Sequence, residues 1–140
     1  RCGVSHGAPR RHFPTLALLL AAIAEMCFDE LHHHLTNAKG GLKETARAYV
    51  AYAVEHPHAF DLITRHDVLA GSGRELRARS LPLLEQWRAR FAEQRPDAPE
   101  AAAIAAWASV HGVASLASRG VLELVGTDAE ELLDQLLPQS

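Results

Sequence analysis

Residues 100–119, with the sequence EAAAIAAWASVHGVASLASR, decide the fold class of this protein. Alanine is the strongest helix former, and the stretch contains neither a proline nor a run of alternating β-branched residues. Trp107, His111 and Ser115 follow one another at intervals of four residues, so they share one face of the predicted helix. The many small side chains let other helices approach closely. A helix of this kind is typical of a helical bundle.

Outward from this stretch, the chain also consists of helical segments, separated by glycine and proline. The residue before Pro57 disfavours a helical backbone, so one helix ends there and another begins. The sequence therefore predicts an all-α bundle of about seven helices without strands. The expected helices cover residues 5–13, 15–37, 42–55, 57–65, 72–94, 97–119 and 127–137.

The composition is that of a soluble globular protein. Of the 140 residues, 48% are hydrophobic and 22% charged, which argues against a disordered chain. The two cysteines, Cys2 and Cys27, exclude a disulfide scaffold and suit a reducing cytoplasm. The longest apolar run, residues 16–24, is too short for a membrane span of about 20 residues. We expect a cytoplasmic protein without membrane contact.

Charge is distributed unevenly along the chain. Residues 1–24 contain Arg1, Arg10 and Arg11 and no acid, whereas residues 25–140 carry a net charge of −6. A basic end on an acidic body indicates that an anionic partner, such as nucleic acid, would bind at the N-terminus.

The N-terminal residues resemble part of a DNA-binding motif. Gly3-Val4-Ser5-x-Gly7 followed by His12-Phe13-Pro14-x-x-x-x-Leu19-Leu20 is similar to the end of the helix-turn-helix of the tetracycline-repressor (TetR) family of transcriptional regulators. The resemblance implies that residues 1–14 are the remnant of that domain and that residues 15–140 form a ligand-binding and dimerisation domain. The side chains it implies in DNA contact are Ser5, His6, Ala8, Arg10, Arg11 and His12.

The sequence departs from this family pattern at two positions. Arg10 stands where the family usually has a tyrosine, and Leu16 replaces a phosphate-binding lysine. The first helix and most of the second helix of the DNA-binding domain are also absent from the sequence. We therefore expect the fragment as given to bind DNA poorly or not at all.

Two further stretches extend the resemblance over most of the chain. Ala48-Tyr49-Val50-x-x-Ala53-x-x-x-His56-Pro57 and Trp107-x-x-x-His111-Gly112-x-x-x-Leu116 resemble a TetR subgroup whose C-terminal domain is named for its Trp, His and Gly. In this family, the C-terminal domain commonly encloses an inducer.

A small-molecule pocket is the main candidate site. Aromatic side chains on several predicted helices, with a few polar tips, have the usual composition of such a pocket. The alternative is that the aromatic residues form ordinary core and that His111 is a satisfied buried histidine. The residues that we expect to bind an effector, which is largely apolar, are Cys27, Leu31, Tyr49, Tyr52, Phe60, Trp87, Phe91, Trp107 and His111.

Metal binding and catalysis have weaker support. His32, His33 and His34 are consecutive, so on a helix they point in different directions, and no His-x-x-x-His or Cys-x-x-Cys spacing occurs. Ser115 lies one turn from His111, but no nucleophile elbow accompanies them. We expect no metal, no cofactor and no enzymatic activity.

The Ala-rich helix and the last helix offer more apolar surface than one internal stripe requires. A symmetric four-helix dimer interface would cover it, although both stripes could also be internal core. The sequence therefore predicts a dimeric repressor whose operator binding is altered by a small molecule. The alternatives are a helical ligand-binding protein without DNA binding and a helical enzyme that uses His111.

Overall fold

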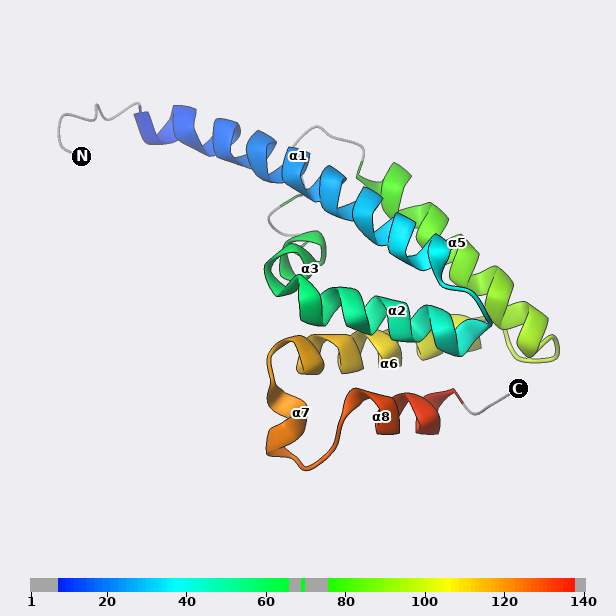
Figure 1. Cartoon of the computed structure of the whole chain (residues 1–140). Coiled ribbons are helices and arrows are strands. Elements are labelled where there is room, and N and C mark those ends of the chain that lie inside the picture. Colours follow the sequence, from blue (N-terminus) through cyan, green and yellow to red (C-terminus); the bar gives the residue numbers. More distant parts are fainter. Residues whose placement is uncertain (1–7, 66–68, 70–75, 138–140) are drawn as a thin grey trace.

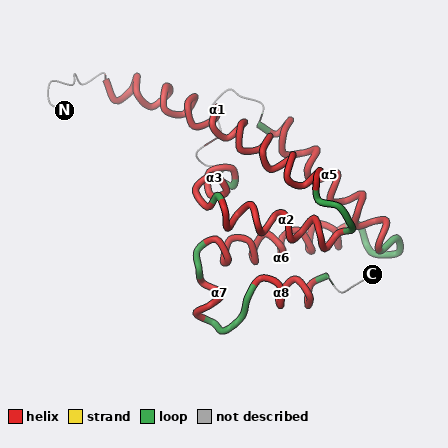
Figure 2. Tube along the Cα trace, in the orientation of Figure 1, coloured by secondary structure: helices red, strands yellow, loops and turns green. Residues whose placement is uncertain are grey.

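The structure of the chain, a computed structural model, describes residues 8–65, 69 and 76–137, with side chains from Thr15 onward. Seven helices and no strands occur in these residues, which confirms the all-α prediction (Figures 1 and 2). The helices are α1 (Ala8–Asn37), α2 (Leu42–Glu55), α3 (Pro57–Ile63), α5 (Arg77–Gln94), α6 (Ala101–Ser118), α7 (Val121–Leu124) and α8 (Ala129–Leu136).

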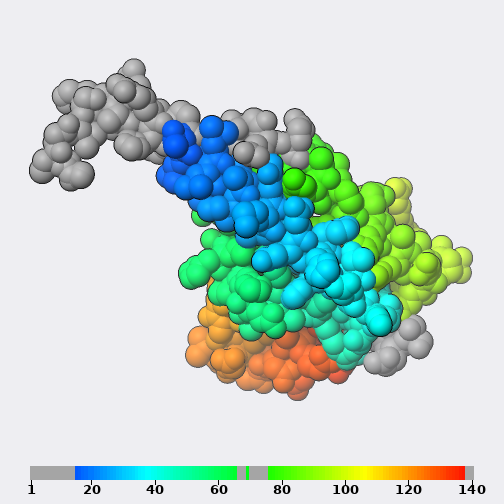
Figure 3. Space-filling view, turned by 45° about the horizontal axis from the view of Figure 1, so that its top comes forward, coloured from blue at the N-terminus to red at the C-terminus, as the bar shows by residue number. Residues whose placement is uncertain are grey.

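The helices form a bundle around α2 and α6. These two helices pack against each other, and both also contact α5 and α8. Helix α1 lies across α2, α3 and α5 on one side of the bundle, and α7 and α8 lie on the opposite side (Figure 1). The N-terminal part of α1 projects beyond the other helices (Figure 1). In the space-filling view of Figure 3, the blue part of α1 lies beside the green helix α5. The continuous core includes Leu31, Tyr52, Trp87, Val110 and Leu133.

Glycine and proline set the ends of the central helices as the sequence predicts. Gly40 adopts a φ of 117°, which is accessible to glycine at little steric cost, and α2 begins two residues later. Pro57 occupies the first turn of α3, where its missing N–H would have no helical partner. The prediction of a helix over 42–55 is confirmed.

Three predicted helix starts are wrong. A single helix, α1, runs through Pro14, so the expected break between residues 13 and 15 is absent. Pro14 is the seventh residue of α1, beyond its first turn, and the helix continues although the hydrogen bond to the Arg10 carbonyl is missing. Helix α6 begins at Ala101 rather than near residue 97, since Ala98 precedes a proline. Helix α8 is capped by Asp128 rather than Thr127, because Asp128 Oδ1 accepts from Glu131 N at 2.9 Å.

Helix α6 is unusually apolar. Among the described residues, it is the one helix that is long and apolar enough to cross a membrane by length and composition alone. Of its residues, 22% are buried within the protein. It packs against α2, α5, α7 and α8, as the central helix of a bundle does. Its exposed positions are mostly small or apolar: Ala101, Ala105, Trp107, Ala108, Ser109, Gly112 and Leu116.

Candidate functional site

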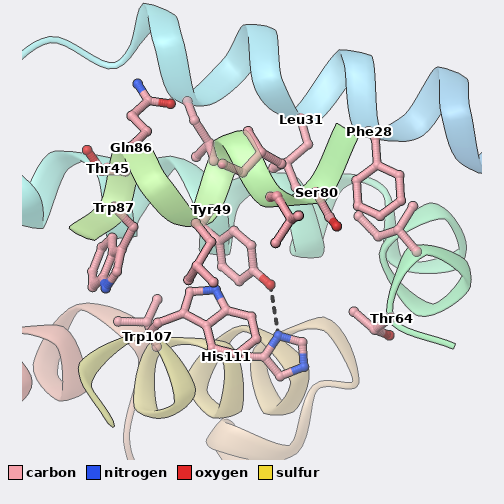
Figure 4. A pocket seen from close by; sticks show the side chains of 16 residues that line it. Phe28, Leu31, Thr45, Tyr49, Thr64, Ser80, Gln86, Trp87, Trp107 and His111 are labelled. Carbon is pink, nitrogen blue, oxygen red and sulfur yellow. Dashed lines mark hydrogen bonds between the residues drawn. The ribbon is translucent and has the colours of Figure 1, made fainter. Parts of the chain in front are cut away.

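A cavity of about 410 Å³ lies between α1, α2, α3, α5 and α6. This volume falls within the usual range for small-molecule sites. Figure 4 shows its side chains converging from helices that are far apart in the sequence. The lining residues are Phe28, Leu31, Leu35, Thr45, Tyr49, Ile63, Thr64, Ser80, Leu81, Leu83, Leu84, Gln86, Trp87, Trp107, Val110 and His111.

Tyr49 and His111 form the central polar pair of the cavity. The Tyr49 hydroxyl and His111 Nδ1 lie 2.8 Å apart and join α2 to α6 (Figure 4). Burial raises the pKa of Tyr49 well above its usual value, so the phenol keeps its proton. Burial also lowers the pKa of His111, which favours the neutral imidazole. Both members of the pair are therefore uncharged at neutral pH.

The two tryptophans differ in their environment although both line the cavity. Trp87 is 5% exposed, and its Nε1 donates to the carbonyl oxygen of Ala103 at 2.7 Å, which ties α5 to α6. Trp107 is 36% exposed, and its ring centroid lies 5.4 Å from that of His111, with 32° between the ring planes. Trp87 is thus a fixed wall, whereas Trp107 lies at an accessible edge.

The remaining polar side chains of the cavity mostly bond to nearby backbone. Thr45 Oγ1 donates to the Gly41 carbonyl at 3.2 Å, and Thr64 Oγ1 donates to the Asp61 carbonyl at 2.9 Å. The Arg90 guanidinium donates to Thr45 Oγ1 but does not itself line the cavity. Among the described residues, no Asp, Glu, Lys or Arg lines this space. Its chemistry suits an uncharged molecule.

Comparison with known protein families assigns the chain to a family. The family model "Tetracyclin repressor-like, C-terminal domain" matches residues 42–139. The chain belongs to the TetR family. No curated protein and no solved structure matches it. The C-terminal domains of TetR regulators are ligand-binding and regulatory rather than catalytic.

In this TetR-family domain, five of the nine predicted ligand-binding residues line the cavity. They are Leu31, Tyr49, Trp87, Trp107 and His111. Their arrangement agrees with the sequence prediction that residues at helical spacing on several helices converge. A role for them in binding an effector stays a prediction.

The other four predicted ligand-binding residues do not line the cavity. Cys27 and Phe91 are buried in the core, and the Arg95 guanidinium lies 5.9 Å from the Phe91 ring centroid. Phe60 is buried beside the cavity, with its ring centroid 5.3 Å from that of His111. Tyr52 faces α1, where its hydroxyl donates to the Cys27 carbonyl at 3.3 Å. The helical period placed these four side chains inward but did not show which buried face borders the cavity.

Several lining residues were missed by the sequence analysis. Phe28 and Leu35 lie three residues before and four after Leu31, on the same face of α1. That spacing was available as a signal. Leu84 and Ser80 of α5 lie three and seven residues before Trp87, so the same helical spacing also placed them on the face of that predicted residue.

The predicted DNA contacts fall at the start of the chain. Ser5 and His6 lie outside the described residues. Ala8, Arg10, Arg11 and His12 belong to the first turns of α1, where only the backbone is described. Their contact with DNA stays a prediction.

The histidine run lies on the outer part of α1. His33 Nε2 is 2.9 Å from Asn37 Nδ2, and His34 Nε2 is 3.8 Å from Glu55 Oε1. Within the part of the chain that the structure describes, no group of three potential ligands is arranged to hold a metal ion.

Proposed function

We propose that this protein is a ligand-responsive, DNA-binding transcriptional regulator, a repressor whose operator binding is altered by a small molecule. One observation carries the proposal: α1 contributes a wall of the cavity and also includes residues 8–14, the expected DNA-binding remnant. The same rigid element thus joins the two sites that a regulator must couple.

Helix α1 provides a mechanical route for this coupling. Phe28, Leu31 and Leu35 of α1 face the cavity, so a ligand that enlarges the cavity pushes on this helix. Arg10 lies 21 residues before Leu31, which is about 30 Å along a helix. A rotation of about 5° around the cavity would move the helix start by about 3 Å. Two recognition helices that must span about 34 Å would then lose their spacing.

We place a homodimer interface on α6 and α8, as the family assignment favours. Ala105, Ala108, Gly112 and Leu116 form an exposed stripe of mainly small residues along α6, which would let a second copy approach closely. On α8, Leu133 is buried inside the protein and Leu136 is 36% exposed, and Leu137, directly after the helix, is also buried. One face of α8 therefore packs inward, and the other remains for the partner.

The dimer is tested at Gly112. Nothing lies within 4 Å of a Cβ built at this position, so Gly112→Glu leaves the fold of one protomer intact. We expect sedimentation equilibrium to show a dimer for the unchanged protein and a monomer for Gly112→Glu. A monomer at micromolar concentration for the unchanged protein would refute this interface.

DNA binding is tested with the complete product of the gene that encodes this chain. Selection from genomic fragments should enrich an inverted repeat with half-sites about 34 Å apart. The regulator proposal would be refuted if no sequence is preferred and the affinity for DNA depends only on the salt concentration.

Coupling is tested by filling the cavity. Val110 is 1% exposed and lines the cavity from α6, so Val110→Phe occupies part of the space. We expect operator affinity to change at least fivefold, the lower range for allosteric coupling. The matched control is Val54→Phe on the outer side of α2, where the side chain is 50% exposed. An equal effect of both changes would contradict coupling through the cavity.

A second candidate function is a helical small-molecule-binding protein without DNA binding. Its support is the family match over residues 42–139, which is to the ligand-binding, regulatory domain of TetR-family proteins. This function would be supported if small molecules bind the cavity while the complete gene product enriches no specific DNA sequence in the selection from genomic fragments.

A further inference from the structure

We propose that the cavity binds an uncharged, largely apolar molecule whose carbonyl-type oxygen accepts a hydrogen bond from the indole N–H of Trp107. This inference rests on the proposed ligand-binding role of the same cavity and adds the chemistry of the ligand.

The lining excludes a charged ligand. None of the described lining residues carries a formal charge, and an ion without a partner in such a space loses several kcal/mol of hydration. The Tyr49–His111 pair is neutral, because burial opposes ionisation of both side chains. The Arg90 guanidinium reaches the cavity only through Thr45 Oγ1, so an anion would have to displace that contact.

Most polar groups of the cavity are already occupied. The Trp87 N–H is bonded to Ala103, and the Thr45 and Thr64 hydroxyls are bonded to backbone carbonyls. Figure 4 shows the Gln86 amide directed toward α1 and away from Trp107 and His111. As hydrogen-bond donors, these groups are therefore unavailable as the main anchor of a ligand.

Trp107 is the available donor. Its Nε1 can only donate, and among the described residues it has no hydrogen-bond partner. In Figure 4 this nitrogen lies on the edge of the ring that faces Tyr49 and the cavity. The cavity therefore offers the Trp107 N–H as a donor and selects a ligand that accepts a hydrogen bond.

A carbonyl oxygen matches this donor, because it accepts a hydrogen bond without bringing a donor of its own. The flat group beside it would pack against the Trp107 ring and the aliphatic walls from Leu31 and Leu83. Uncharged aromatic or alicyclic ketones, esters and amides share this chemistry.

Four naphthalene probes of nearly equal size test the inference by titration calorimetry on the intact chain. Acetylnaphthalene carries the carbonyl, and isopropenylnaphthalene replaces that oxygen with a methylene group of similar shape. Naphthoate and naphthylmethylammonium supply the two charges. We expect the ketone to bind about tenfold tighter than the alkene, as one hydrogen bond provides, and both ions to bind more weakly than the ketone.

One substitution assigns the donor, and one outside the cavity is its control. Trp107→Phe keeps an aromatic ring but removes the N–H, so the ketone should lose its advantage over the alkene. Val54→Phe changes a side chain that is 50% exposed and does not line the cavity, so the tenfold preference should remain. The ratio of the two affinities is read in each folded variant, which separates this effect from changes in stability.

The possible outcomes distinguish a failure of this inference from a failure of the proposed ligand-binding function. Equal binding of ketone and alkene, tighter binding of naphthoate, or a preference that survives Trp107→Phe overturns the inference and leaves a ligand-binding domain. If neither neutral probe binds, the cavity is not a binding site, and the ligand-responsive function fails together with the inference.

Discussion

Replacing Trp87 by phenylalanine should destabilise the protein by about 2 kcal/mol, well beyond the same change at Trp107. The Trp87 indole is 5% exposed and donates to the Ala103 carbonyl at 2.7 Å. Loss of one such hydrogen bond costs about 1 kcal/mol. A phenyl ring also buries about 40–50 Å² less apolar surface than an indole, which adds about 1 kcal/mol. The space left behind joins the existing cavity.

Trp107→Phe is the matched comparison, with an expected loss of about 0.5 kcal/mol. Its side chain is 36% exposed and has no hydrogen-bond partner among the described residues. Urea unfolding followed by far-ultraviolet circular dichroism, at one fixed protein concentration, gives both values from the shift in midpoint at constant slope. Equal losses, or a larger loss for Trp107→Phe, would refute the role of Trp87 as the tie between α5 and α6.

Three further predictions concern pH and backbone geometry. Burial lowers the pKa of His111 and keeps the folded imidazole neutral. The contribution of His111 to the free energy of unfolding is therefore complete above its usual pKa of about 6.5 and decreases as the pH falls below that value. The variant His111→Asn should flatten this part of a pH–stability curve. The hydrogen bond from the Arg47 guanidinium lowers the pKa of Glu130. The ion pair therefore stabilises the fold above the usual carboxyl pKa, and this stabilisation is lost as the pH falls through the pKa of the folded state. In an acid titration, Arg47→Gln should lose less stability than the unchanged protein. Gly40→Ala should cost about 1–3 kcal/mol in thermal unfolding, because φ is 117° and the new Cβ would lie 2.6 Å from Glu44 Cγ, whereas Gly41→Ala, with open space around it, should stay within about 0.5 kcal/mol.

Local signals accounted for the helices of the bundle more completely than for their ends. Gly40 adopts a backbone conformation that other residues rarely adopt, and Pro57 restricts the residue before it, so these positions predicted the ends of α2 correctly. Pro14 exerts the same restriction, yet α1 runs through it. Helices that continue through a proline exist, and no short stretch of this sequence distinguishes them from helices that end there.

In the cavity, too, the local sequence predicted some features, and the packing between helices decided the others. Trp107 and His111 were predicted together because four residues separate them on one helix. The hydrogen bond between His111 and Tyr49 joins residues 62 positions apart, and only the contact of α2 with α6 brings them together. Cys27 and Phe91 illustrate the converse case. Periodicity marks them as buried, but a side chain next to a cavity and one in solid core have the same sequence pattern.

The different surroundings of the two tryptophans give the protein a built-in optical reporter. Trp87 also lines the cavity, but it is already buried and hydrogen-bonded, so a ligand changes its contact with water little. Trp107, at the accessible edge of the same cavity, exchanges water for ligand when the cavity fills. Intrinsic emission should therefore separate into a constant component and a responsive one. The difference between them would report occupancy of the cavity without any attached dye.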